Sequence, residues 1–431
     1  MATVVIVGAQ WGDEAKGKMV DVLGSQADMV VRYSGGNNAG HTVIVGTEEF
    51  KFHLIPAGIL HEHVTSVLGG GMVICPKGLL DELGATRAKR AKLGTLIISA
   101  GAHVVFPYHR MLDRLEEEAR GENKIGTTSR GIGPAYQDKV ARHGIRMGEF
   151  VNPAIFRKRM TEVLAYKNRL LSMFGEAPLD LEALLAEYEV YAEKLRPYVK
   201  DADVLVQDAV ISGKRVMFEG AQGALLDLDC GTYPFVTSSY PVAGGACLGT
   251  GIGPRHIDGV LGVCKSYATR VGAGPFPTEL DDELGEHIRV KGKEYGTTTG
   301  RGRRCGWMDL VALRHSCRMN SLSGLIVTRL DILCDFETVR AAVAYELEGA
   351  QITHVPTNTH EFAACKPVYE DLPGWSGNLS SARALEQLPP NARAFLRYLE
   401  EYTGVPVAIV SVGPARDETI IVRPDLIWSG S

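Results

Sequence analysis

A glycine-rich segment near the start of the chain, residues 8–18, has residue types that suit a phosphate group. Lys16 and Lys18 supply positive charge, and the segment follows an apolar run that we expect to be a buried strand. A loop between a strand and a helix directs backbone N–H groups at an anion. The spacing matches neither the Walker A pattern, because no Ser or Thr follows Lys18, nor the GxGxxG pattern.

Two carboxylates, Asp13 and Glu14, lie inside this segment. A carboxylate repels an anionic ligand unless it binds a metal or moves a proton. We therefore predict a nucleotide-phosphate site with a catalytic carboxylate, Asp13, built into it. The alternative interpretation is a charged cap at the start of a helix.

A second segment, residues 34–42, is rich in Gly and Asn and contains His41 near its end. The apolar residues that follow predict a strand, so His41 is expected at a strand edge, where active-site loops gather. A single histidine is usually structural, but this position favours a functional role.

Several other segments suit anion recognition. Residues 126–134, with Lys139 and Arg142 downstream, combine threonine hydroxyls, backbone N–H groups and a guanidinium, as in a second anion site. Residues 296–304 carry three arginines beside hydroxyls and glycines, which would bind a small dicarboxylate or a phosphate; a solvated basic loop is the alternative. The polar residues at 219–223 and 237–239 are either specificity contacts or turns.

Residues 328–331 end an apolar run with the sequence Thr-Arg-Leu-Asp, which is similar to the guanine-reading Asn-Lys-x-Asp pattern of GTPases. The carboxylate of Asp331 can accept both N–H donors on the edge of guanine, which adenine cannot supply. This motif therefore favours a guanine nucleotide.

Strands and helices that recur along the chain must position these segments. Short apolar runs predict strands at residues 3–9, 29–33, 41–45, 96–98, 216–218, 259–264, 325–330 and 405–412. Helical spacing predicts helices at residues 16–23, 153–174, 179–199, 308–319 and 382–402, the last interrupted by Pro389 and Pro390. The fold class is α/β, with a large, mainly parallel central sheet and helices on both faces. We expect a single domain over residues 1–431, with a mainly helical inserted subdomain at residues 100–200.

Composition excludes some classes of protein. The net charge of −5 argues against a general nucleic-acid or membrane-surface binder. The sequence contains no stretch of about 18 apolar residues, which a membrane span would need. The eight cysteines show no metal-ligand spacing, as expected of reduced thiols in a cytoplasmic protein. We therefore expect neither a nucleic-acid nor a membrane partner.

Taken together and in this order, the motifs resemble the adenylosuccinate synthetase family over residues 4–422. The resemblance is carried by residues 12–18, 37–42, 126–128, 219–223, 297–301 and 328–331. It implies a relative of the P-loop NTPase fold without the Walker A sequence. It also implies a homodimeric ligase that makes adenylosuccinate from IMP and L-aspartate at the expense of GTP, the first committed step of AMP synthesis from IMP.

The resemblance also implies a mechanism. Asp13 would remove the N1 proton of IMP, so that the O6 oxyanion attacks the γ-phosphate of GTP, and His41 would serve as an acid. The amine of aspartate would then displace phosphate from C6 of the 6-phosphoryl intermediate. Mg²⁺, held by Asp13 and the carbonyl of Gly40, would bridge phosphate oxygens.

The remaining positions follow from the same resemblance. Lys16 and Gln222 join Asp13 and His41 as catalytic residues. GTP is bound by Gly12, Glu14, Ala15, Gly17, Lys18, Gly40, Thr42, Arg303, Arg329, Leu330, Asp331, Ser411, Val412 and Gly413. IMP and aspartate are bound by Asn38, Ala39, Thr128, Arg142, Thr237, Thr297, Thr298, Thr299, Gly300, Arg301 and Gly302, with Arg142 supplied by the partner subunit.

Four positions depart from the family pattern. Ala15 replaces a loop glycine, which matters only if that position needs a positive φ. Arg329 stands where lysine usually precedes the guanine-reading carboxylate, so its apolar stem would pack differently along the base. Ser129 and Gly302 replace a glycine and an arginine that are frequent in the family.

Two other functions fit part of the pattern. A synthetase of the same fold that makes 2-aminoadenylosuccinate from dGMP is disfavoured, because such relatives tend to be shorter and lack the aspartate that matches Asp13. A GTP-binding regulatory protein without ligase activity would explain residues 328–331. It would leave Asp13, His41 and the arginine-rich segment without a role.

Overall fold

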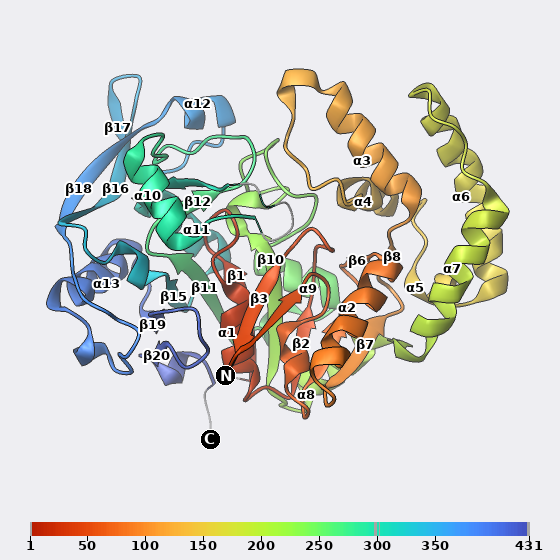
Figure 1. Ribbon diagram of the computed structural model, residues 1–431, viewed down its shortest axis with the longest axis horizontal. Helices are drawn as coiled ribbons and strands as arrows, with labels where there is room; N and C mark the ends of the chain where they lie inside the picture. Colours follow the sequence, from red (N-terminus) through yellow and green to blue (C-terminus); the bar gives the residue numbers. More distant parts are fainter. Residues whose placement is uncertain (1, 297–299, 301, 429–431) are drawn as a thin grey trace.

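The centre of the molecule is a ten-stranded sheet in the computed structural model, which describes residues 2–296, 300 and 302–428 (Figure 1). The strand order is β20 (Thr419–Ile421), β19 (Val407–Ser411), β15 (Gly324–Thr328), β11 (Gly259–Lys265), β1 (Thr3–Gly8), β10 (Val216–Gly223), β2 (Met29–Arg32), β5 (Thr65–Leu68), β7 (Thr95–Ser99) and β9 (Val199–Lys200). Every neighbouring pair is parallel except β19 with β20. The expected mainly parallel sheet is confirmed.

Both faces of this sheet are buried, as the continuous apolar runs of its strands require. In β1, Val4 and Ile6 belong to one hydrophobic cluster, whereas Val5 and Val7 belong to another, since successive side chains point to opposite faces. The first cluster includes side chains of helices α1 (Lys16–Gly24) and α2 (Pro76–Lys89). The second includes side chains of α8 (Ala202–Ile211), α11 (Leu310–Asn320) and α13 (Pro390–Thr403).

Smaller sheets flank the central one. The predicted strand at residues 41–45 is present as β3 (His41–Val45), but it pairs with β4 (Glu48–Phe52) in an antiparallel hairpin rather than joining the central sheet. Its partly exposed residues suit a hairpin that is buried on one side only. The other small sheets contain β6 (Val73–Ile74) and β8 (His103–Val104), β12 (Ala268–Arg270) and β13 (Arg304–Gly306), and β14 (Met308–Asp309), β16 (Thr338–Leu347), β17 (Ala350–Ile352) and β18 (Lys366–Pro373).

Residues 100–200 contain α3 (Pro107–Ala119), α4 (Ile132–Ala141), α5 (Met147–Phe150), α6 (Pro153–Met173) and α7 (Leu181–Leu195). The two helices expected after residue 153 are confirmed as α6 and α7, which lie side by side at one end of the molecule (Figure 1). Their buried side chains belong to the same cluster as those of α1 and α2. The division into one domain with an inserted helical subdomain stays a prediction.

The helix expected at residues 382–402 is shorter than predicted and begins only at Pro390. A proline at the first helical position is tolerated, but the residue before a proline is driven to an extended conformation, so a helix cannot run through Pro389. The other helices are α9 (Gly244–Thr250), α10 (Glu283–Gly292) and α12 (Thr359–Ala364). In the described part of the chain, no helix has both the length and the hydropathy needed to cross a membrane.

Candidate active site

The loops at the carboxyl ends of β1, β10, β11 and β15 meet at one edge of the parallel sheet, where ligand sites of α/β proteins form. A cleft of about 400 Å³ lies there. Residues predicted from the sequence that line it are Asp13, Glu14, Ala15, Lys16, Gly17, Asn38, Ala39, Gly40, His41, Thr42, Thr128, Gln222, Arg303 and Arg329. Segments separated by up to about 300 residues in sequence therefore share one cavity.

Asp13 forms an ion pair with Arg303 inside this cleft, with Oδ2 2.8 Å from Nε. The Asp13 side chain is 30% exposed, whereas that of Arg303 is only 7% exposed. Burial lowers the pKa of Arg303, but the carboxylates of Asp13 and Glu294 outweigh that effect and raise it overall. Arg303 is therefore a permanent positive charge beside Asp13.

His41 is held by Glu219, a residue of β10 with no solvent exposure. The Nδ1 atom of His41 lies 2.5 Å from Glu219 Oε1, and Glu219 Oε2 accepts the backbone N–H of Ala57 at 3.2 Å. A carboxylate at Nδ1 favours the tautomer that carries its proton there, so Nε2 is free to exchange a proton. The polar residues at 219–223 predict specificity contacts or a turn, and this role of Glu219 does not follow from them. A carboxylate within an apolar strand is the sequence signal that points to it.

Glu14 lines the cleft, and its carboxylate also holds the loop in shape. Its Oε1 accepts the backbone N–H groups of Gln10 and Gly12, at 3.1 and 2.8 Å. Its Oε2 lies 2.6 Å from Nζ of Lys16. The loop is thus closed by its own carboxylate, and Lys16 is drawn toward it.

Three departures from the family pattern, Ala15, Ser129 (φ 52°) and Arg329, fall at positions with a positive φ. Ala15 has φ 65° and ψ 33°, and Arg329 has φ 62°. An L-residue with a side chain is disfavoured in this region, where glycine is not. Because φ is positive at Ala15, the replacement of the usual loop glycine by alanine strains the backbone there.

Helix α1 packs closely against the start of β3. A Cβ atom on Gly17 would lie 2.6 Å from the Cβ of His41, closer than two carbons can approach. Only glycine lets α1 and the histidine meet at this distance. The need for Gly17 is thus steric, in addition to any contact with phosphate.

A second hollow of about 160 Å³ continues from the cleft. Asn38, Thr128 and Gln222 line both, and Thr237 lines the second. Gln222 has φ 66° where the register between β1 and β10 is irregular, which turns the end of β10 toward the site. The residues expected to hold one substrate therefore lie along one continuous surface.

Lys18 is directed away from the cleft. Its ammonium donates to Ser411 Oγ at 2.7 Å, to the Gly413 carbonyl at 2.7 Å and to the Glu418 carbonyl at 2.9 Å, which uses all three of its donors. Burial lowers its pKa to about 8, although Glu418 and Asp331 act in the opposite direction. Lys18 thereby ties α1 to the loop after β19.

Asp331 follows β15 in a short 3₁₀ helix, Leu330–Leu333. Its Oδ1 is buried and accepts no hydrogen bond from any residue that the structure describes. Burial raises the pKa of Asp331, while Arg329 and Lys18 act to lower it. A buried carboxylate oxygen without a donor is costly and is commonly explained by a ligand. Leu330 is fully buried, as is Val412 after β19.

Some predicted residues do not line the cleft, and others lie outside the described residues. Arg142 is exposed at the end of α4, with φ 65°. Thr297, Thr298, Thr299 and Arg301 lie outside the described residues. Gly300 and Gly302 are described, and Gly302 pairs with Tyr295 at the base of their loop.

Comparison with known proteins gives consistent matches over nearly the whole chain. The sequence model of the adenylosuccinate synthetase family matches residues 5–420. Adenylosuccinate synthetase from Carboxydothermus hydrogenoformans is 55% identical over 423 residues, which are 98% of this chain and 99% of that protein. The same enzyme from Streptococcus gordonii is 50% identical over 430 residues, covering 100% of each chain.

Solved structures agree with this match. Fully ligated adenylosuccinate synthetase from Plasmodium falciparum has a TM-score of 0.92 and 37% identity, over 98% of this chain and 100% of that one. Succinoaminodeoxyadenylate synthetase from cyanophage S-2L, bound to dGMP and dATP, has a TM-score of 0.62 and 19% identity over 98% of this chain and 97% of that one, and at this identity it supports the fold alone. The chain therefore belongs to the adenylosuccinate synthetase family.

Proposed function

We propose that the cleft carries out the GTP-dependent ligation of IMP and L-aspartate to adenylosuccinate, with release of GDP and phosphate, and that Asp13 and His41 perform its proton transfers. The protein is a ligase of AMP synthesis that uses GTP as co-substrate. The observation that carries the proposal is the meeting of Asp13, Lys16, His41 and Gln222 in one cleft. The relatives at 50–55% identity are named adenylosuccinate synthetases, in contrast to the dGMP-bound relative at 19%.

In the first step, Asp13 takes the N1 proton of IMP while the O6 oxygen attacks the γ-phosphate of GTP. The O6–P bond forms as the bond to GDP breaks, and Lys16 offsets charge on the transferred group. In the second step, the free amine of aspartate attacks C6, the C6–O6 bond breaks, and phosphate departs with O6. The departing phosphate takes up the proton that the amine nitrogen loses. His41, held at Nδ1 by Glu219, donates from Nε2 in its protonated form to O6 as negative charge develops there.

The second hollow suits the nucleotide that accepts the phosphoryl group. Asn38, Thr128, Gln222 and Thr237 offer amide and hydroxyl groups along it, and none of them is charged. Aspartate would be bound by the arginine-rich segment that begins beside the cleft, where Gly296 and Arg303 line its wall. A guanidinium is well suited to a carboxylate because it offers paired donors.

The guanine of GTP would be read by Asp331, whose unpaired Oδ1 can accept from the N1–H and N2–H groups. Ser411 and Gly413, which accept hydrogen bonds from Lys18 at the end of β19, would border the base, because β19 lies beside β15, the strand that precedes Asp331. The stem of Arg329 lines the cleft nearby and can lie along the ring.

Mg²⁺ fits the donors that this cleft offers. The described residues include no group of three or more His, Cys, Asp or Glu side chains arranged for a metal, so a site made of protein groups alone is not indicated there. Mg²⁺ usually binds through one or two carboxylates together with substrate phosphates, and the partly exposed carboxylate of Asp13 with the Gly40 carbonyl suits that mode. The bound ion would offset charge on the phosphate oxygens.

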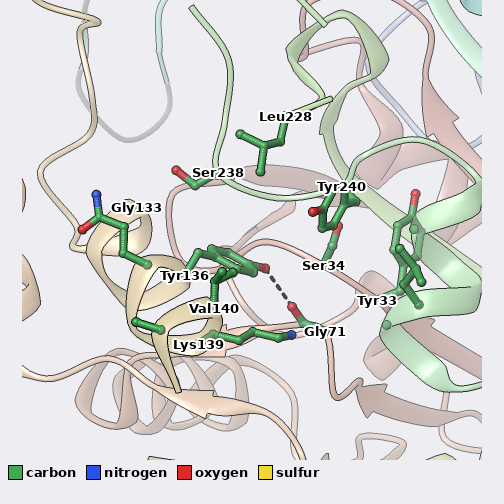
Figure 2. Close-up of a pocket in the computed structure, with 15 residues that line it drawn as sticks. Tyr33, Ser34, Gly71, Gly133, Tyr136, Lys139, Val140, Leu228, Ser238 and Tyr240 are labelled. Atoms are coloured by element: carbon green, nitrogen blue, oxygen red, sulfur yellow. Dashed lines mark hydrogen bonds between the residues drawn. The ribbon is translucent and has the colours of Figure 1, made fainter. Parts of the chain in front are cut away.

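A homodimer would supply Arg142. This side chain is exposed and has no hydrogen bond or ion pair with residues in the described part of the chain. The adjacent surface is an apolar hollow of about 680 Å³, which Figure 2 shows with Tyr136, Lys139 and Val140 of α4 on one side. Val140 and Leu248 line it and are 77% and 74% exposed.

Large exposed apolar side chains around a hollow are typical of a surface that another protein covers. We propose that a second copy of the chain covers this hollow and brings its own Arg142 to the neighbouring cleft. A cytoplasmic location is part of the same proposal, supported by eight cysteines that are all free.

The test of the function is an assay of GDP and phosphate release by the purified protein with IMP, aspartate, GTP and Mg²⁺. Release should require all three organic substrates, and adenylosuccinate should accumulate in equal amount. Each substrate is omitted in turn, and dGMP is tried in place of IMP. Equal release without IMP or without aspartate would overturn the ligase assignment.

A further inference from the structure

A chain of buried charges lies directly behind the ion pair of Asp13 and Arg303. Lys265 and Glu294 have no solvent exposure, and Lys265 Nζ lies 2.8 Å from Glu294 Oε1. The same oxygen accepts the hydroxyl of Tyr267 at 2.5 Å. Glu294 Oε2 accepts Nη1 of Arg303 at 2.5 Å. A buried charge is costly unless it is paired, so we expect this network of paired charges to position or stabilise a neighbouring group.

The backbone of Arg303 is also held by Glu294. The N–H of Arg303 donates to the Glu294 carbonyl at 2.9 Å, and Tyr295 pairs with Gly302 one residue further along the loop. The Arg303 carbonyl accepts Nε of Arg289 at 2.8 Å. Glu294 and Arg303 thus close the base of the arginine-rich segment through both main chain and side chain.

This anchoring leaves the Nε edge of the Arg303 guanidinium directed at the cleft. Glu294 occupies Nη1, while Nε lies 2.8 Å from Asp13 Oδ2 without pointing at it. The N–H of Nε is poorly aligned with that oxygen, so the two groups form an ion pair without a hydrogen bond. A guanidinium N–H that pairs with the reacting carboxylate in this way can turn to a second acceptor, such as a ligand carboxylate.

The charge on Glu294 is permanent. Burial would raise its pKa, but the positive charges of Lys265, Arg303 and Arg329 outweigh burial and lower the pKa to about 2. Removal of this carboxylate would therefore release Arg303 and also leave Lys265 buried without its charged partner.

We propose that Glu294 is a positioning residue for the ligation: it directs Arg303 toward Asp13 and toward the carboxylate of the incoming aspartate, without touching a substrate itself. The inference rests on the proposed function, because it takes aspartate to be the ligand whose carboxylate Arg303 binds. Loss of Glu294 should therefore weaken the capture of aspartate more than it slows the chemical steps.

The experiment compares the full-length protein with Glu294→Gln and with the double variant Glu294→Gln/Lys265→Met. The double variant removes both buried charges, so any instability caused by an unpaired Lys265 is relieved. We expect the KM for aspartate to rise about 10- to 100-fold in both variants, as for the loss of a charge-assisted hydrogen bond. The value of kcat should fall less than about threefold, since Glu294 does not contact the reacting atoms.

The matched control is Glu279→Gln. Glu279 pairs with Arg304, the residue next to Arg303, with Oε1 2.7 Å from Nε, but it does not line the cleft. This control should leave the KM for aspartate unchanged. A normal KM for aspartate in the double variant, or an equal rise in the control, would overturn the inference. Failure of the unaltered protein to require aspartate would instead overturn the proposed function.

Discussion

His41 and Glu219 are joined by a contact of 2.5 Å between Nδ1 and Oε1, which links the hairpin β3–β4 to the central strand β10. The hairpin lies outside the central sheet, so this contact fixes the histidine relative to Asp13. A catalytic histidine depends on such a partner, because the group at one ring nitrogen sets the tautomer at the other.

Glu219→Gln is expected to lower kcat by about 10- to 100-fold, the usual cost of losing the partner that orients a histidine. The amide keeps the size of the side chain but can present an N–H to Nδ1, which favours the wrong tautomer. Steady-state kinetics with all three substrates measure the effect, and thermal unfolding checks that the fold is retained. A folded variant with kcat within twofold of normal would contradict the role of this pair.

Gly17→Ala is expected to lower activity by at least about tenfold, because the new Cβ would force His41 to move. Alanine is a better helix former than glycine, so propensity alone predicts a neutral or stabilising change. Gly24→Ala in the same helix is the control, since its Cβ would meet no atom closer than 3.6 Å. Equal activities of the two variants would show that the close approach is not required.

Ala15→Gly is expected to stabilise the protein by roughly 0.5–1 kcal/mol, because glycine adopts a positive φ without the strain that alanine bears. The free energy of unfolding in urea measures the change. Ala85→Gly, at an exposed position within α2, should destabilise by about 1 kcal/mol and serves as the opposite control. Destabilisation by both substitutions would mean that Ala15 carries no strain.

Asp13→Asn is expected to reduce turnover by about 10³-fold or more, since an amide cannot take the N1 proton of IMP. Binding of GTP should remain, because the asparagine still fits beside Arg303 and the guanine is read elsewhere. Titration calorimetry with GTP and product formation by the same sample separate the two effects. Near-normal turnover would remove Asp13 from its assigned role.

Mixing inactive Arg142→Leu protein with inactive Asp13→Asn protein is expected to restore about a quarter of normal activity, if each cleft of a dimer takes Arg142 from the other subunit. Half of the randomly mixed dimers are hybrids, and each hybrid has one intact site out of two. The mixture is assayed after subunit exchange and compared with each parent. No recovery despite proven exchange would argue that Arg142 acts within its own subunit.

Much of the fold could be predicted because strands that are buried on both faces are continuous apolar runs. Thr65–Leu68 was missed although it lies in the middle of the sheet, since Thr65 and Ser66 interrupt the apolar pattern. The predicted helix at residues 382–402 was too long, because its apolar spacing continued upstream of the prolines. Strands β16 and β18 were also missed; much of β18 is exposed, so its pattern is weak.

The sequence by itself determined the family and the residues that are expected to act, because the chemistry of phosphate, base and carboxylate recognition restricts residue types within short segments. Only the tertiary structure decided which side chains hold others in place. Glu219 and Glu294 lie 178 and 9 residues from the side chains they orient, His41 and Arg303. Such pairs follow from how strands are ordered and how loops close, and local sequence does not encode that packing. The positive φ of Ala15 has the same origin, since the surrounding loop imposes a conformation that alanine would not choose alone.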